Sequence, residues 1–325
     1  MTFLKRSLEV VAVASLFFVA NAQAVLIGPG LGTQNTTQPP NTPGWYNVGK
    51  LSIGTGVYLG NGWVLTAAHL DPVFHNSITF YTDAHSPNDG FPSLGTTYQL
   101  DTSATGYHRL TNPDSTATDL VLIRTLTDPG LPSLTLPSVT TPHGTGVTIA
   151  GIGVNRGAPV QYDSNFNEVA SNGTFSGYKF DPNGNSFNLV SKRWGTTTTS
   201  AISANTDTQV VNNTANNSFT TVNLSIFQSP NNNATSNEAI GVSGDSGGAL
   251  FSSASPNTLL GILLYQATFA NQPAGTALYG NGTEAADLAT YASQIQSIVA
   301  TPEPTTGLLL IGSVGMLLRR KRRCI

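Results

Sequence analysis

The segment Gly244–Gly248 constrains this chain more than any other stretch, because a single serine stands there among small residues. Glycines let the backbone turn sharply, so a substrate carbonyl has room to approach Ser246. In such a turn the N–H groups of Gly244 and Ser246 point at one developing oxyanion. The pattern predicts that Ser246 is a nucleophile in acyl transfer and that Gly244 and Ser246 form its oxyanion hole.

The order of the catalytic histidine, aspartate and serine along the chain distinguishes the folds that use such a serine. A Gly-x-Ser-x-Gly motif also fits the nucleophile elbow of an α/β-hydrolase, in which the catalytic histidine follows the serine. All five histidines precede Ser246, which excludes that order. The first aspartate, Asp71, follows His69, so an order that begins with aspartate leaves only the later histidines. The order histidine, aspartate, serine remains.

Two further motifs supply a histidine and an aspartate in that order. Trp63–His69 is an apolar run with small residues near its end, which predicts a buried strand that delivers His69. Asp119 opens a second β-rich run, Leu120–Arg124. The same part of the chain alternates short runs, such as Leu51–Ile53, with turn residues, which indicates a barrel or a sandwich.

The three motifs resemble the signatures of the chymotrypsin-like (trypsin-like) serine proteases. The matching segments are Thr66–His69, Asp119–Ile123 and Gly244–Leu250, and the resemblance covers most of Trp45–Val299. It implies an all-β fold with two antiparallel six-stranded barrels, the active site in the cleft between them, and a closing helix at Tyr291–Val299. It also implies a secreted serine endopeptidase that needs no cofactor and no metal.

The resemblance assigns a role to each residue of the triad. His69 is the general base and Ser246 the nucleophile. Asp119 holds the imidazole in the tautomer that accepts the serine proton and stabilises the imidazolium that forms. Asp101 and Asp114 are rivals to Asp119, although neither begins an apolar strand.

The specificity pocket departs from the family pattern. Ile240 stands six residues before the nucleophile, where cleavage after Lys or Arg requires a carboxylate. The family's Ser-Trp-Gly wall is replaced by Leu264, Tyr265 and Gln266, and Gln266 narrows the pocket. We therefore expect cleavage after small or medium apolar residues. Glu238 is the alternative, because its carboxylate would restore basic specificity if it reached the pocket.

Two other functions use the same residues. One is a surface-displayed binding module on a protease scaffold whose catalysis has lapsed, although all three triad residues are present. The other is an esterase with the same triad, because acyl chemistry is shared between esters and peptides.

Asp245 adjoins the nucleophile in a poorly solvated position, where a carboxylate needs a partner or several hydrogen-bond donors. In many relatives of the resembled family, a newly freed α-ammonium pairs with this aspartate and sets the oxyanion loop. Cleavage after Ala24 would free Val25 for that role. Leu26 and Pro29 depart from the family's activated N-terminus, and internal hydrogen bonds to Asp245 are the alternative.

Both ends of the chain carry targeting patterns. Two basic residues, the apolar run Val10–Ala20 and a small-residue site predict a signal peptide over residues 1–24, which signal peptidase removes. Residues 301–325 resemble a PEP-CTERM sorting signal, with Pro302, Glu303 and Pro304 followed by an apolar stretch and a basic cluster. This implies an exosortase-like processing enzyme and export to the envelope of a Gram-negative bacterium. An uncleaved membrane tail is the alternative.

Between these ends we expect an extended lead-in over residues 25–44, a first barrel over about 45–140 and a second over about 143–300. The segment from Val25 to Thr301 holds 15 acidic and 7 basic residues, a formal charge of −8, which argues against nucleic acid and anionic membranes as partners. Cys324 is the only cysteine, so no intramolecular disulfide is possible. Many relatives carry a disulfide cysteine where Leu70 stands here, so packing must hold that loop.

Overall fold

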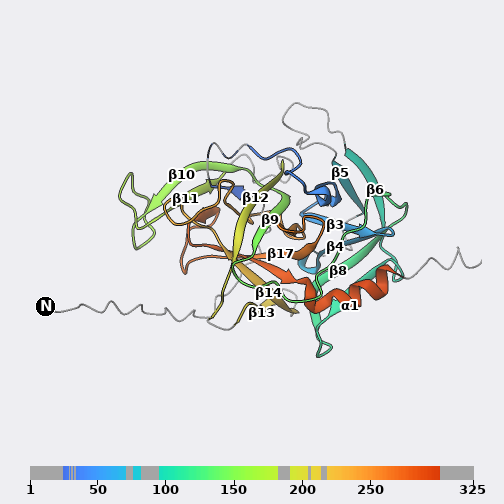
Figure 1. Ribbon diagram of the computed structural model, residues 1–325. Helices are drawn as coiled ribbons and strands as arrows, with labels where there is room; N and C mark the ends of the chain where they lie inside the picture. The colour runs from blue at the N-terminus through green and yellow to red at the C-terminus, as the bar shows by residue number, and fades with distance from the viewer. Residues whose placement is uncertain are drawn as a thin grey trace, which may run out of the picture.

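The computed structural model describes residues 25–28, 30, 32, 34–70, 76–81, 95–181, 191–203, 206–213 and 218–300. The predicted signal peptide and the sorting motif at Pro302, Glu303 and Pro304 lie outside the described residues. Figure 1 shows two β-rich units side by side, with strands β3, β4, β5, β6 and β8 in one and β9, β12, β14 and β17 in the other.

The first unit is a closed barrel. Its strands are β2 (Val48–Lys50), β3 (Thr55–Gly60), β4 (Trp63–Ala67), β5 (Ser77–Tyr81), β6 (Gly95–Asp101), β7 (Tyr107–Thr111) and β8 (Ala117–Thr125). They follow the order β4-β3-β2-β5-β6-β8, and a further pairing of β4 with β8 closes a ring of six. Strand β7 also pairs with β8, along residues 117–123. Closure gives the ring no unpaired edge of its own.

The second unit repeats this plan with different strands. They are β9 (Gly146–Gly153), β12 (Ser191–Ser200), β13 (Gln209–Asn213), β14 (Ser218–Ile226), β16 (Ala249–Ser252), β17 (Leu259–Ala267) and β19 (Gly282–Asp287). The order is β12-β9-β16-β17-β19-β14, closed by a β12–β14 pairing, and β13 extends from β14. The predicted pair of antiparallel six-stranded barrels is confirmed.

Two smaller sheets and one helix complete the described chain. Strands β10 (Arg156–Tyr162), β11 (Phe175–Phe180) and β18 (Thr276–Leu278) form a three-stranded sheet. Strand β1 (Leu26–Ile27) pairs with β15 (Ala239–Ile240). Short 3-10 turns occur at η1 (Pro43–Asn47) and η2 (Ala68–Leu70). The helix α1 (Leu288–Val299) has 12 residues, and no helix within the described ranges has the length and hydrophobicity for a membrane span.

The closing helix is confirmed, but it starts three residues before the predicted Tyr291. Asp287 precedes it as an N-cap, and its carboxylate accepts a hydrogen bond from the Ala289 N–H. The predicted strand Leu51–Ile53 is wrong, because the strand is Val48–Lys50 and a bend follows it. Leu51 is nevertheless buried in the core, which explains why an apolar run stands there.

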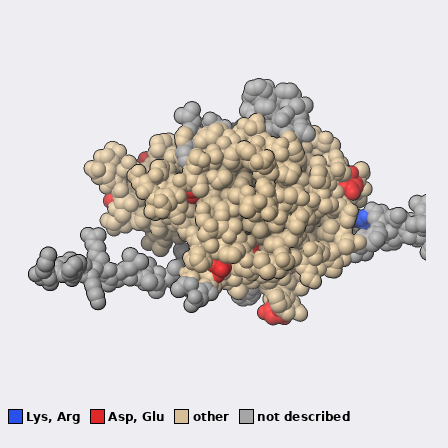
Figure 2. Space-filling view, in the orientation of Figure 1, with Lys and Arg blue, Asp and Glu red and all other residues tan. Residues whose placement is uncertain are grey.

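One apolar core continues from the first barrel into the second. It joins Leu65, Leu120 and Leu122 of the first barrel to Ile262 and Leu264 of the second. Because these side chains are buried together, the barrels pack against each other through apolar surface. Figure 2 shows one face of the molecule with only isolated charged side chains.

Candidate active site

His69 reaches the junction of the barrels from the end of strand β4. The strand ends at Ala67, and the turn η2 carries His69 in its middle position. Strand β4 pairs with β8 in a register that sets Ala67 opposite Leu120. The pairing therefore places the turn with His69 beside Asp119, the residue before Leu120.

Two hydrogen bonds join His69 to Asp119. His69 Nδ1 lies 2.6 Å from Asp119 Oδ2, and the His69 backbone N–H donates to Oδ1 at 2.6 Å. The Asp119 side chain is fully buried, and the His69 side chain is 6% exposed. A carboxylate on Nδ1 fixes the imidazole so that Nε2 is left for chemistry.

Asp119 has further contacts with the second barrel. The Tyr265 hydroxyl on β17 donates to Asp119 Oδ2, and the Tyr265 ring stacks on the His69 ring with centroids 5.8 Å apart and planes at 27°. The Asp119 N–H donates to the Thr220 hydroxyl of β14 at 2.8 Å. Both barrels thus hold the aspartate.

Ser246 lies on a turn that only glycine can build. Gly244 and Gly247 have φ of +99° and +84°, in the left-handed region. A Cβ on Gly247 would lie 1.9 Å from the Thr55 carbonyl oxygen, and one on Gly244 would lie 2.7 Å from Gly153 Cα. Close approach and φ together therefore require both glycines.

The Ser246 turn is bonded to the first barrel next to the histidine. The Thr55 N–H donates to the Ser246 carbonyl at 2.9 Å, and the Thr55 hydroxyl donates to the Gly244 carbonyl at 2.8 Å. A Cβ on Gly54 would lie 2.6 Å from Leu70 and 3.1 Å from the Ser246 carbonyl oxygen. The residue after His69 and the predicted nucleophile therefore meet at Gly54.

The groups around Ser246 are ready for a ligand. Within the described chain the Ser246 N–H donates to no acceptor, whereas those of Asp245 and Gly247 donate to the Val242 and Leu263 carbonyls. Within the described residues, Ser246 Oγ and His69 are not joined by a hydrogen bond. The oxyanion role of Gly244 and Ser246 and the role of the triad stay predictions.

Asp245 is fully buried, and only one of its two carboxylate oxygens has a hydrogen-bond partner among the described residues. Its Oδ2 accepts a hydrogen bond from the Val242 N–H at 3.1 Å, and its Oδ1 has no partner. Burial raises the pKa of this carboxyl well above its usual range. A Cβ on Gly151 would lie 1.8 Å from Oδ1, so the neighbouring strand leaves room for the acid only because it has glycine there.

The first described residues run beside the strand that leads to Asp245. Leu26 pairs with Ile240, and Val25 is 2% exposed. Arg156 donates to the carbonyls of Ile27 and Gly28 at 2.8 and 2.6 Å, and also to that of Gly30. Tyr178 lies 4.2 Å below the Arg156 guanidinium and donates its hydroxyl to the Gly28 carbonyl at 2.6 Å. This part of the lead-in is therefore bound to the second barrel.

The predicted pocket residue Ile240 has apolar surroundings. Ile240 is fully buried in an apolar cluster with Val154, Phe180 and Phe227. The Glu238 carboxylate, in contrast, accepts hydrogen bonds from the Gln228 N–H, the Thr235 N–H and the Thr197 hydroxyl. Its own loop engages this carboxylate, and burial raises its pKa.

The other predicted wall residues have different surroundings. Leu264 is buried in the core between the barrels, and the Gln266 amide donates to Asn281 Oδ1 at 3.4 Å. Sequence reasoning missed Thr283, which pairs with Gln266 and accepts the Gly241 N–H at 2.9 Å through its hydroxyl. Only the pairing of β17 with β19 reveals it, because Thr283 has no motif of its own.

The rival aspartates lie in turns of their own. Asp101 accepts the Ser103 N–H at 2.9 Å, and Asp114 accepts the Thr116 N–H and hydroxyl at 3.1 and 2.6 Å. These donors lower the pKa of both carboxyls. Asp71 lies outside the described residues. Among these aspartates the structure brings Asp119 to His69.

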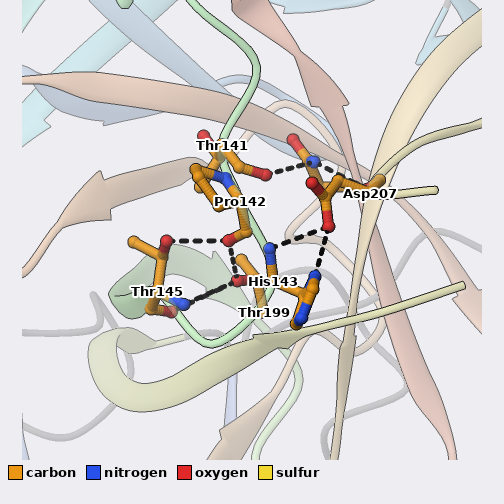
Figure 3. A network of polar contacts seen from close by, with 7 residues as sticks. Thr141, Pro142, His143, Thr145, Thr199 and Asp207 are labelled. Atoms are coloured by element: carbon orange, nitrogen blue, oxygen red, sulfur yellow. Dashed lines mark hydrogen bonds and ion pairs between the residues drawn. The ribbon is translucent and has the colours of Figure 1, made fainter. Parts of the chain in front are cut away.

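A second histidine and aspartate meet on the surface, where the chain enters the second barrel (Figure 3). His143 Nδ1 lies 2.6 Å from Asp207 Oδ1, and the His143 N–H donates to the same oxygen at 3.0 Å. The preceding Pro142 carbonyl accepts hydrogen bonds from the Thr145 and Thr199 hydroxyls, each at 2.7 Å. The network ties the connector to β12.

No group of three or more metal-ligating side chains occurs among the residues that the structure describes. Comparison with protein families gives one match: the Trypsin family model matches residues 34–179. The matched part includes His69 and Asp119 and ends before Ser246. No curated protein matches the chain.

Solved structures that match the chain include the following three. A mutant of human heparin binding protein (CAP37) has a TM-score of 0.46 at 14% identity, over 83% of this chain and 97% of that one. A scabies mite inactivated protease paralogue has 0.44 at 16%, over 79% and 96%. Neuropsin, a serine protease of mouse brain, has 0.44 at 16%, over 81% and 98%.

The two closed six-stranded barrels give the chain the chymotrypsin fold. Over residues 34–179 the chain is similar to the Trypsin family.

Proposed function

We propose that this protein is an active, secreted serine endopeptidase. The observation that carries the proposal is the buried His69–Asp119 pair, held at 2.6 Å beside the glycine-built turn of Ser246. A histidine fixed in this way has Nε2 available as a base, and the serine turn offers a free N–H for an oxyanion.

The chemistry follows from these groups. Ser246 Oγ attacks the scissile carbonyl while His69 Nε2 takes the hydroxyl proton, and the N–H groups of Gly244 and Ser246 stabilise the oxyanion. The imidazolium, stabilised by Asp119, then gives its proton to the leaving amine, so that an acyl-enzyme remains. Water attacks the acyl-enzyme with His69 again as base, and Ser246 regains its proton when the acid leaves.

The proposed substrates are proteins or peptides cut after small or medium apolar residues. Support comes from the apolar surroundings of Ile240 and from the Thr283 hydroxyl, which is bonded to Gly241 near the base of the pocket. The Glu238 carboxylate is engaged by its own loop, so it provides no charge for a basic side chain. Turnover of peptides with Ala, Val or Lys before the scissile bond compares these possibilities.

We also propose that signal cleavage after Ala24 activates the enzyme. The β1–β15 pairing sets Val25 near the strand that leads to Asp245, whose Oδ1 lacks a partner. A freed Val25 ammonium would supply one, and Arg156 holds the carbonyls that follow. One alanine placed before Val25, with the new N-terminus confirmed by sequencing, should reduce turnover steeply while the fold persists. An unchanged rate would show that something else satisfies Asp245.

The proposed location is the envelope of a Gram-negative bacterium, reached through the sorting tail. The tail pattern, Pro302, Glu303 and Pro304 with an apolar stretch and a basic cluster, supports this proposal. Replacing the three residues by alanine in the native host should stop sorting. Mass spectrometry of the exported wild-type protein decides whether Cys324 and Ile325 have been removed.

Covalent labelling tests the catalytic proposal directly. Wild-type protein should react with a fluorophosphonate, Ser246→Ala should not, and Ser243→Ala, a serine three residues earlier, should react normally. Loss of the nucleophile typically lowers turnover by about a millionfold. An unlabelled wild-type protein would instead favour a binding module, and cleavage of a short-chain ester without cleavage of denatured protein would indicate an esterase.

A further inference from the structure

Tyr265 contacts both residues of the buried pair, although its position in the sequence suggested a pocket wall. Its hydroxyl donates to Asp119 Oδ2, the same oxygen that lies 2.6 Å from His69 Nδ1. Its ring stacks on the His69 imidazole at 5.8 Å between centroids. One side chain thus contacts the carboxylate and the face of the base.

An irregularity in strand β17 explains how Tyr265 arrives there. In the pairing with β19, Leu263 is opposite Ala285 and Tyr265 is opposite Glu284, so the register shifts at Leu264. A bulge of this kind adds a residue to one strand and redirects the side chains around it. Leu264 is buried in the core, and Tyr265 packs against the same core from a partly exposed position.

The contacts matter because Asp119 is fully buried. A buried carboxylate is costly unless donors satisfy its oxygens. Asp119 Oδ1 accepts the His69 backbone N–H, and Oδ2 receives both His69 Nδ1 and the Tyr265 hydroxyl. The hydroxyl comes from the second barrel, whereas His69 and Asp119 both belong to the first. It therefore fixes the plane of the carboxylate across the junction.

We propose that Tyr265 is a positioning residue that orients the His69–Asp119 pair through its hydroxyl and its ring. It acts on the substrate only through these two residues. Orientation of the base within a few tenths of an ångström governs proton transfer, so loss of the hydroxyl should affect the chemical step more than substrate binding. The proposal rests on the proposed peptidase function for its kinetic part alone.

The test compares Tyr265→Phe, which keeps the ring, with Tyr265→Leu, which removes ring and hydroxyl. Tyr291→Phe is the matched control, because the Tyr291 hydroxyl also makes hydrogen bonds across two elements, to Asn112 and with the Thr221 N–H at 2.9 Å each. We expect Tyr265→Phe to lower kcat about tenfold to a hundredfold with little change in KM, as for loss of a hydrogen bond to a charged group. Tyr265→Leu should lower it further, and Tyr291→Phe should leave kcat unchanged.

A second measurement does not depend on catalysis. In the Ser246→Ala protein, the His69 Nδ1–H resonance in the proton NMR spectrum reports its hydrogen bond to Asp119. Adding Tyr265→Phe should move this resonance and speed its exchange with water, whereas adding Tyr291→Phe should not.

The outcomes separate the two proposals. If fluorophosphonate does not label the wild-type protein, the proposed peptidase function is wrong. The NMR comparison still decides the role of Tyr265 in that case. An unmoved resonance in the Tyr265→Phe protein overturns the positioning role. A rise in KM with kcat and the resonance unchanged also overturns it and makes Tyr265 a wall of the substrate pocket.

Discussion

Two histidine–aspartate pairs of this protein use the same donor groups, the histidine N–H and ring Nδ1, and differ in their surroundings. In each pair, Nδ1 lies 2.6 Å from the carboxylate and the histidine N–H donates to the same aspartate, at 2.6 Å from His69 and 3.0 Å from His143. The His69 and Asp119 side chains are 6% and 0% exposed, whereas those of His143 and Asp207 are 55% and 33% exposed. The hydrogen-bond geometry alone therefore does not mark a catalytic pair.

Burial and neighbours make the difference. Water and salt screen the interaction between His143 and Asp207, and such exposed pairs contribute little. The side chains of His69 and Asp119 are almost completely shielded from solvent, and Tyr265 and the Ser246 turn lie against the pair. A fixed polar group acts more strongly in such surroundings. The same two residue types thus fasten a connector in one place and, in the proposed function, orient a catalytic base in the other.

The largest effect on kcat is expected from a substitution that breaks the buried His69–Asp119 pair. Asp119→Asn should lower kcat about ten-thousandfold, because the amide favours the wrong imidazole tautomer. Asp207→Asn is the matched change in the exposed pair and should leave kcat unchanged. Steady-state kinetics on one peptide substrate measures both. Comparable losses from the two variants would contradict the assignment of Asp119.

The next effect concerns a buried carboxyl on β19, opposite Tyr265. Glu284 is opposite Tyr265 on β19; its Oε1 accepts the Gln209 amide at 2.8 Å, and its Oε2 has no partner. Burial raises the pKa of Glu284 to about 7 from an ordinary 4.5. Ionisation is therefore harder in the folded state, and stability falls as the pH rises from the unfolded value through the folded one.

Glu284→Gln should remove this pH dependence. Between pH 4.5 and pH 8 the wild-type free energy of unfolding should lose about 3 kcal/mol that the variant retains. Urea unfolding at the two pH values measures the difference. Parallel losses in the two proteins would mean that Glu284 does not titrate in this range.

The smallest effect belongs to the exposed pair. Hydrogen bonds from the His143 side chain and N–H lower the pKa of Asp207. A lowered carboxyl pKa stabilises the fold above the ordinary aspartate range, and that gain is lost as the pH falls through the folded value. Asp207→Asn should therefore be slightly less stable than the wild type at pH 7 and equal to it in acid. Thermal unfolding at both pH values checks this, and a large difference in acid would be inconsistent with it.

Local signals predicted short strands in a barrel or a sandwich, and the family resemblance implied the two barrels and the meeting of His69 with Asp119. Apolar runs marked β4 and β8, and their pairing follows from the barrel. Sequence reasoning did not anticipate the Tyr265 contacts, because a register shift at Leu264 decides them and no composition signal marks a bulge. The Thr283 bond to Gly241 was missed for a similar reason, since it joins residues 42 apart that only pairing brings together.

The packing of Leu70 has a consequence for the redox behaviour of the protein. This side chain is 3% exposed and lies against Gly54, directly after the predicted base. The loop is held by apolar contact in place of a sulfur bridge, and the sole cysteine, Cys324, has no thiol within the chain to pair with. Folding of the domain needs no disulfide, so thiol reductants should leave its turnover intact.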